Sequence, residues 1–269
     1  MTKITIGQYY PTDSCIHKLD PRVKLCGTVL YVVLLLVANH FSGYVAAAFF
    51  LAIIVKLSQV PPKMIFRGLR AVFIILIVIA ATNIFMTPGG ETLLHIGFIR
   101  ITTLGVVLAI QMSVRLVLLI SGSSILTLTT SPIELTDGIE FLLRPLKKIK
   151  VPAHDIAMMM TIALRFIPTL ADEMDKILKA QKARGADFDT GGLIKRGKSL
   201  LPILVPLFVS AFKRAEELAT AMEARCYRGD INRTKMKEMN MKLSDWVGVF
   251  VLVLFCGAVI ATRFLYLDI

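Results

Sequence analysis

Cysteine and acidic residues are scarce in this chain of 269 residues. The four cysteines (Cys15, Cys26, Cys226 and Cys256) include no C-x-x-C pair, so the sequence indicates neither a disulfide framework nor a zinc site. The four histidines are scattered singly, so we expect no metal site. The first 22 residues contain no apolar run, and the sequence therefore predicts no cleavable signal peptide.

Apolar residues are abundant instead. They make up 55% of the chain, and the mean hydropathy is +0.70, both of which are typical of a membrane protein. Five apolar stretches are candidates to cross the bilayer, at 23–41, 43–57, 69–87, 104–130 and 246–264. We therefore expect an all-α membrane protein with about five transmembrane helices. Its parts are an N-terminal membrane region at 1–130, a polar block at 131–245 and a last transmembrane helix at 246–269.

The basic residues indicate an orientation. Lys and Arg outnumber Asp and Glu by 31 to 19, for a net charge of +12. The connection at 39–42 has no Lys or Arg, whereas 56–70 carries Lys56, Lys63, Arg67 and Arg70. Because basic loops stay in the cytoplasm, the N-terminus, the 56–70 loop and the block 131–245 are predicted to be cytoplasmic and the C-terminus external.

Arg115 stands in the middle of the fourth predicted span, where an unpaired charge is costly. No acidic residue lies in any predicted span. Gln111, backbone carbonyls, water or a partner protein must therefore satisfy its guanidinium group.

The block 131–245 holds 20 Lys and Arg against 15 Asp and Glu and contains two helical patterns. In the first, Leu170, Met174, Ile177 and Leu178 share one face. In the second, the apolar face contains Phe208, Ala211, Phe212, Ala215, Leu218 and Met222, with Lys213, Arg214, Glu216, Glu217 and Glu223 opposite. We expect two long amphipathic helices at the cytoplasmic surface, packed on each other, on the spans or on another protein.

Both helices end alike. The sequences at 180–184 and 221–225 match as A-x-x-A-R, and Gly185 or Cys226 follows. An Arg in the last turn suits the negative end of the helix dipole, and Gly185 can adopt the left-handed conformation that ends a helix. Capping explains one such end, but the duplication indicates two similar docking elements.

One further pattern is misleading. Residues 192–199 fit the G-x-x-x-x-G-K-[ST] pattern of a phosphate-binding loop. A buried strand must precede such a loop, yet 186–191 is polar and Pro202 and Pro206 follow it. We therefore interpret this segment as a basic linker between the two helices, not as a nucleotide site.

Several of these segments together resemble one known family. Residues 19–25 (LDPRVKL), 164–168 (LRFIP), 183–185 (ARG) and 222–229 (MEARCYRG) look like the transmembrane T component, EcfT, of energy-coupling factor transporters. The resemblance runs from residue 19 to the last predicted span. Cys226 departs from the simplest Ala-Arg-Gly form of the motif.

The resemblance implies a non-catalytic scaffold in an ABC-type importer of vitamins or other micronutrients in the cell membrane. Two cytoplasmic ATPase subunits would be held through Ala183, Arg184 and Gly185 and through Ala224, Arg225 and Cys226, with ATP and Mg²⁺ bound on those partners. A membrane-embedded, substrate-binding S component would contact an apolar surface, for which the candidates are Met158, Met159, Met160, Leu164 and Ile167. An ordinary helix core explains these five residues equally well.

Two other classes stay open on the residues alone. A self-contained secondary transporter or channel would need polar groups converging at mid-membrane, and Arg115 and Gln111 are almost the only ones. A membrane-anchored nucleic-acid binder is disfavoured by the nearly balanced charge of 131–245.

Overall fold

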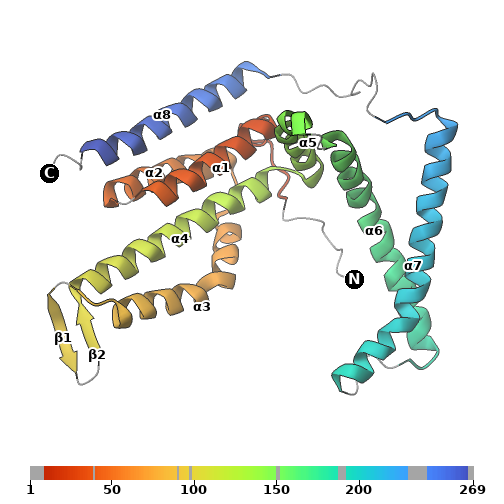
Figure 1. The fold of residues 1–269 in the computed structure, drawn as a ribbon, viewed down its shortest axis with the longest axis horizontal. Coiled ribbons are helices and arrows are strands. Elements are labelled where there is room, and N and C mark those ends of the chain that lie inside the picture. The colour runs from red at the N-terminus through yellow and green to blue at the C-terminus, as the bar shows by residue number, and fades with distance from the viewer. Residues whose placement is uncertain are drawn as a thin grey trace. The chain divides into compact units, whose positions relative to one another are not determined.

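The computed structural model describes residues 9–38, 40–89, 91–96, 99–149, 152–186, 192–229 and 241–265 (Figure 1). The described residues are mainly helical, as predicted. The elements, in chain order, are α1 (Pro21–Val37), α2 (Phe41–Ser58), α3 (Pro62–Met86), β1 (Thr92–Ile96), β2 (Ile99–Thr102), α4 (Thr103–Thr129), α5 (Pro132–Leu143), the 3-10 helix η1 (Arg144–Ile149), α6 (Ala153–Ala183), α7 (Leu193–Ala224) and α8 (Leu243–Leu265).

The chain divides into two compact units. The membrane unit comprises Gly7–Gly138 with Glu238–Ile269, and the α6–α7 unit comprises Ile139–Lys237. The unit boundaries therefore fall near 138 and 237, beside the positions 130 and 245 that composition suggested.

Among the described residues, four helices of the membrane unit are long and apolar enough to cross a bilayer, namely α2, α3, α4 and α8. These correspond to four of the five predicted spans. The segment predicted at 23–41 forms α1, which has 17 residues and ends at Val37, before Ala38 takes an extended conformation with ψ 114°. It is shorter than the apolar run because the chain must turn back to begin α2 at Phe41.

The start of α1 forms as its sequence predicts. Asp20 caps the helix by accepting a 2.9 Å hydrogen bond from the backbone N–H of Arg22, and Pro21 occupies the first turn. Asp245, buried at the start of α8, accepts hydrogen bonds from the backbone N–H of Asp20 at 2.8 Å and of Lys242 at 2.7 Å. One carboxylate thus joins the beginnings of two helices that are far apart in sequence.

The core of the membrane unit is aromatic and aliphatic. The rings of Tyr31, Phe50 and Phe255, from α1, α2 and α8, stack with centroids 4.2 to 6.2 Å apart. Gly122 of α4 lies against Tyr31, where a Cβ atom would come within 2.5 Å of the ring. The small residue therefore allows α1 and α4 to pack closely.

Arg115 finds its partners inside the membrane unit. Its guanidinium group donates to the backbone carbonyl of Ala38 at 2.8 Å and to the hydroxyl of Tyr44 at 2.9 Å, and it lies over the Tyr44 ring. Gln111 also donates to the Tyr44 hydroxyl, at 3.4 Å. A backbone carbonyl was among the partners predicted for Arg115, whereas Tyr44 was not, and the hydrogen bond of Gln111 goes to Tyr44 instead of to Arg115. The charge lies beside the turn that ends α1, where a free carbonyl is available.

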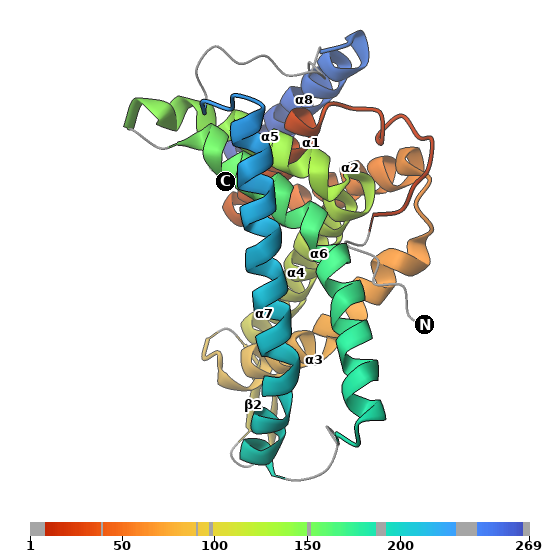
Figure 2. The same cartoon turned by 90° about the vertical axis from the view of Figure 1, so that its right-hand side faces the viewer.

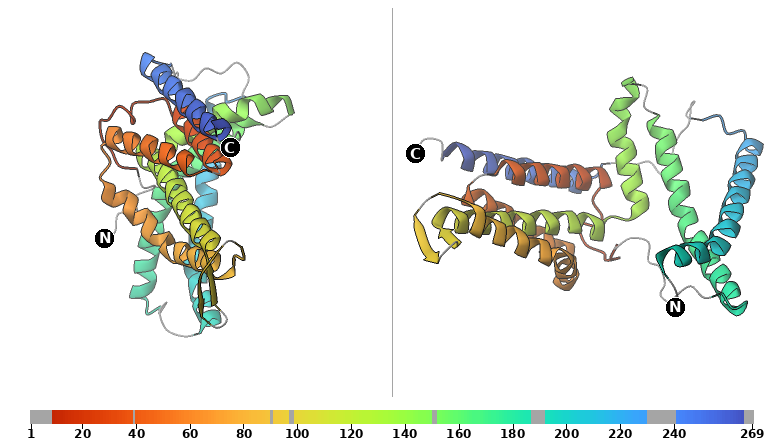
Figure 3. Two further views of the ribbon diagram at one scale, coloured as in Figure 1. Left: turned by 90° about the vertical axis from the view of Figure 1, so that its left-hand side faces the viewer. Right: turned by 60° about the horizontal axis from the view of Figure 1, so that its bottom comes forward.

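The connection between α3 and α4 contains an antiparallel hairpin that the sequence analysis did not predict. Strands β1 and β2 pair with Ile96 opposite Ile99, and α3 and α4 pack side by side (Figure 3). Gly105 at the start of α4 lies 2.8 Å, measured from an ideal Cβ position, from the Asn83 carbonyl of α3. That close approach explains the glycine at this position.

Candidate functional site

The two long helices of the α6–α7 unit are longer than their sequence patterns indicated. α6 runs through Pro168 and α7 through Pro202 and Pro206 without a break. The first turns of α7 lean away from the rest of the helix in Figure 1, as expected near two prolines that each remove a backbone hydrogen bond.

The interpretation of 192–199 as a linker is wrong, because α7 already begins at Leu193. The prolines that suggested a break are accommodated within the helix. The same finding argues against a phosphate-binding loop, which needs non-helical backbone where this segment is helical. Among the described residues there is also no group of three His, Cys, Asp or Glu side chains that could hold a metal ion.

The two helices run antiparallel and contact each other through polar groups (Figure 2). The carboxylate of Glu173 on α6 accepts hydrogen bonds from the Ser210 hydroxyl at 2.6 Å and from the Arg214 guanidinium at 3.1 Å, both on α7. Near the beginning of α6, Met158 accepts a 3.1 Å hydrogen bond through its sulfur from the Tyr227 hydroxyl, just beyond the end of α7. Arg214, which the pattern placed on the solvent face, therefore belongs to the helix contact.

The same contacts favour the ionised form of Glu173. The hydrogen bond from Ser210, together with Arg214, lowers the pKa of the Glu173 carboxyl below its ordinary value. The carboxylate is therefore the form that holds the two helices together.

The end of α6 is a Schellman motif. Arg184 is the C-cap residue, and Gly185 follows with a φ of +84°. The N–H of Gly185 donates to the carbonyl of Lys182, and the N–H of Ala186 donates to that of Gln181, both at 3.0 Å. The predicted left-handed glycine is confirmed.

The end of α7 repeats this geometry residue by residue. Arg225 is the C-cap, the N–H of Cys226 donates to Glu223 at 2.8 Å, and the N–H of Tyr227 donates to Met222 at 3.0 Å. Cys226 has a φ of +57°, so it adopts the left-handed conformation although it carries a side chain. The substitution of cysteine for glycine does not change how the helix ends.

Both motifs are open to solvent within the described chain. Ala183, Arg184 and Gly185 are exposed, as are their counterparts Ala224, Arg225 and Cys226. Among the described residues, neither guanidinium has a side-chain partner. Because α6 and α7 are antiparallel, the two motifs lie at opposite ends of the helix pair, about 40 Å apart at 1.5 Å per residue.

The structure separates the five residues expected to contact an S component into two groups. Met158, Met160 and Leu164 are half-buried, and Met158 contacts Tyr227. Met159 and Ile167 are exposed. Of these five residues, only Met159 and Ile167 present exposed apolar surface on α6.

A larger apolar surface lies on α7. It is formed by exposed side chains that include the 66% exposed Phe208 and the 63% exposed Phe212, whose ring centroids are 5.1 Å apart. The other members are Leu200, Leu201, Leu204, Val205 and Val209. An apolar stripe does not identify its partner, so the sequence alone left open what this face packs on.

Comparison with known proteins agrees with the resemblance. The family model described as "Cobalt transport protein" (CbiQ) matches residues 12–236. The protein named "Energy-coupling factor transporter transmembrane protein EcfT" from Clostridium kluyveri is 54% identical over 260 residues, which cover 96% of each chain. Proteins of the same name from Acidaminococcus fermentans and Ruminiclostridium cellulolyticum are 52% and 51% identical over 95% and 98% of each chain. A match of this length and identity means that the chain belongs to the EcfT family, the transmembrane T components of energy-coupling factor transporters.

Proposed function

We propose that this chain is the scaffold of an ECF-type importer and that Arg184 and Arg225 each dock one cytoplasmic ATPase subunit. The observation that carries the proposal is the pair of helix ends with the same capping hydrogen bonds, each presenting an exposed Arg at one end of an antiparallel helix pair. Two equivalent elements at opposite ends suit two equivalent partners.

The chemistry of each end supports this role. A guanidinium group binds carboxylates and carbonyls through two parallel hydrogen bonds, and Ala183 and Ala224 leave room beside it for a close protein surface. The reversal of the chain after each Arg, at Gly185 or Cys226, makes the Arg the outermost residue of its helix. ATP and Mg²⁺ would bind on the partner subunits, and this chain would contribute no catalytic group.

The second partner is a membrane-embedded S component that binds the vitamin or other micronutrient. Met159 and Ile167 on α6 and the apolar surface around Phe208 and Phe212 on α7 are the surfaces that suit it, because they are apolar and exposed. Met158, Met160 and Leu164 support them from within the helix pair. Closure of the ATPases on ATP would move the docked ends of α6 and α7, and the helices would carry that motion to the S component.

This function sets the orientation in the cell membrane. The ATPases are cytoplasmic, so the α6–α7 unit and the basic segment around Lys56 and Arg70 face the cytoplasm, with the N-terminus on the same side. The charge distribution of the loops supports this arrangement. With α1 counted as a fifth crossing beside α2, α3, α4 and α8, the number of crossings is odd and the C-terminus is external.

The test is a double charge reversal, Arg184→Glu with Arg225→Glu, in the complete transporter. We expect the ATPases to stop co-purifying with the chain and substrate uptake to be lost, because two carboxylates replace the two docking cations. Insertion of the chain into the membrane stays unchanged, since both residues lie outside the spans.

Lys182→Glu with Arg228→Glu is the matched control. These residues are also basic, exposed and adjacent to the two motifs, so the variant changes the net charge equally. The control is expected to retain the ATPases. Normal transport by the Arg184→Glu/Arg225→Glu variant would contradict the docking assignment.

A further inference from the structure

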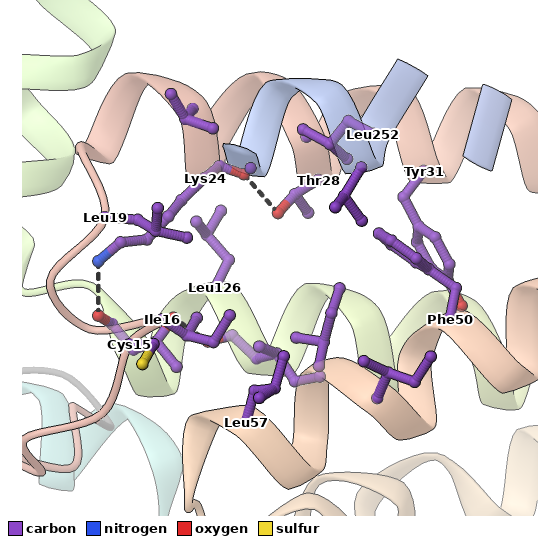
Figure 4. A pocket seen from close by; sticks show the side chains of 18 of the residues that line it. Cys15, Ile16, Leu19, Lys24, Thr28, Tyr31, Phe50, Leu57, Leu126 and Leu252 are labelled. Carbon is purple, nitrogen blue, oxygen red and sulfur yellow. Dashed lines mark hydrogen bonds between the residues drawn. The ribbon is translucent and has the colours of Figure 1, made fainter. Parts of the chain in front are cut away.

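The membrane unit encloses a cavity of about 530 Å³ between α1, α2, α4 and α8 (Figure 4). Its lining is almost entirely apolar, and Val23, Tyr31, Phe50, Leu57, Leu126 and Leu252 are representative. This volume falls in the range of small-molecule binding sites, and a space between helices of a bundle is one of the places where such sites occur.

Phe50 of α2 lines one end of the cavity, and its ring stacks on that of Phe255 of α8 with centroids 4.2 Å apart, which joins the two helices there. Beyond this contact, the lining residues with large exposed surfaces belong to α2 and α8: Ile53 and Leu57 on α2, and Leu243, Val247 and Val251 on α8. The opening therefore lies between these two helices, and its rim is apolar.

The polar groups of the cavity gather at its other end, where α1 and α8 begin and α4 ends. Here the buried Lys24 ammonium donates to the carbonyls of His17 and Thr129, each at 3.0 Å. Thr28, one turn further along α1, donates to the carbonyl of Lys24 at 2.8 Å (Figure 4). The polar end is thus at the ends of the helices and the apolar end lies deeper along them.

The surroundings of α2 and α8 determine which molecule can enter the cavity. Both helices have the length and hydropathy of membrane spans, so the apolar rim faces hydrocarbon. Water is a poor occupant of the deeper part, because a buried water needs two to four polar partners and the lining offers apolar side chains. An empty space of this size would forfeit the dispersion contacts of its lining.

We propose that this cavity is a lipid site, in which one acyl chain of a membrane phospholipid enters between α2 and α8 and its ester end lies towards Lys24 and Thr28. The acyl chain reaches the Tyr31 and Phe50 rings, and the lipid fills the gap that the four helices leave. The site is independent of the ATPase docking proposed above, because it uses residues of the membrane unit alone.

The test is native mass spectrometry of the full chain, alone and in the transporter complex, after detergent washing that removes loosely bound lipid. We expect the wild type to retain one phospholipid per chain, identified by its mass. Thr28→Phe and Val251→Phe, which place a ring in the cavity or its opening from α1 or α8, should lose this one-lipid adduct.

Two variants control for the substitution itself. Thr28→Val keeps the shape of the side chain and should retain the lipid. Ile74→Phe adds an equal ring on the outer face of α3, where Ile74 is 74% exposed, and should retain it too. Circular dichroism of each variant shows whether its helices are formed.

Three outcomes would overturn the proposal. The wild type could retain no phospholipid, or Thr28→Phe and Val251→Phe could retain it while their helices are formed. The adduct could also be present in the isolated chain and absent from the complex, which would mean that partner side chains fill the cavity.

Discussion

Within the membrane unit and within the α6–α7 unit, the helices are held together in opposite ways. In the membrane unit the polar groups Asp245, Lys24 and Arg115 lie among the helices with their hydrogen bonds made, and apolar side chains face outward to lipid. In the α6–α7 unit the helices meet at Glu173 and Arg214, which are 26% and 37% exposed. Large apolar side chains of α7, such as Phe208 and Phe212, lie on its surface.

This difference reflects where the polar and the apolar groups of each unit can find contacts. Hydrocarbon offers no hydrogen bonds, so a charged group such as Arg115 in the membrane unit is stabilised by partners inside the chain. An apolar face outside a membrane is stable only when something covers it. The α6–α7 unit is therefore built for partners, and the following variants test the contrast.

The largest effect is expected from Asp245→Ala in the membrane unit. Removal of this carboxylate leaves the backbone N–H groups of Asp20 and Lys242 without their acceptor, which should lower the free energy of unfolding by about 2–3 kcal/mol. Denaturant unfolding in mixed micelles measures the change. Asp13→Ala, at a carboxylate that is 97% exposed, should have little effect. Equal stability of the two variants would mean that Asp245 does not join α1 to α8.

Tyr44→Phe should cost more than Arg115→Met. Loss of the Tyr44 hydroxyl removes an acceptor from a cation in the membrane unit and costs about 1.5–3 kcal/mol. Arg115→Met removes the charge altogether, and the Tyr44 hydroxyl still donates to the carbonyl of Ala38 at 2.7 Å. Thermal unfolding in the same detergent gives the order. The reverse order would show that the cation itself stabilises the end of α1.

The two helix ends of the α6–α7 unit should respond oppositely to small substitutions. Cys226 has a side chain in the left-handed conformation, which is unfavourable, and glycine has none. Cys226→Gly should therefore stabilise the end of α7 by about 1 kcal/mol. Gly185→Ala imposes that conformation on alanine and should destabilise the end of α6 by a similar amount. Hydrogen exchange at Ala186 and Tyr227 reports each end. Unchanged protection in both variants would contradict the Schellman geometry.

The smallest effect is a pH dependence of the α6–α7 contact. The folded pKa of Glu173 lies below its unfolded value, so its contribution is fully present above the unfolded pKa of about 4.3 and is lost as pH falls through the lowered folded pKa. The protection of the α6 and α7 amides from hydrogen exchange, corrected for the pH dependence of the intrinsic exchange rate, should decrease in that acidic range. Glu173→Gln should remove this dependence, whereas Asp172→Asn, at an exposed neighbour, should keep it.

Local signals predicted much of the fold. The Asp20-Pro21 start of α1, the apolar runs of α2, α3, α4 and α8 and the left-handed Gly185 follow from rules that act within a few residues. The local signals failed at two places. Pro202 and Pro206 suggested a break, yet α7 continues through them. The pattern around Arg214 did not reveal that this residue contacts Glu173 on α6.

The candidate docking residues divide in the same way. Arg184 and Arg225 were identified from a duplicated motif. The duplication is visible in the sequence because both copies end a helix with the same type of cap. Their docking role stays a prediction. That they lie at opposite ends of one helix pair depends on the direction in which α6 and α7 pack, and no short motif encodes that direction.

The sequence by itself determined that this is a helical membrane protein with a polar block and two equivalent Arg-bearing helix ends, because hydropathy and capping depend on neighbouring residues. Only the tertiary structure decided the rest. It assigned Tyr44 and Ala38 to Arg115, joined α1 to α8 through Asp245 and left a cavity between four helices. Those features depend on which side chains meet after the chain has folded, and residues tens of positions apart meet only when their helices pack.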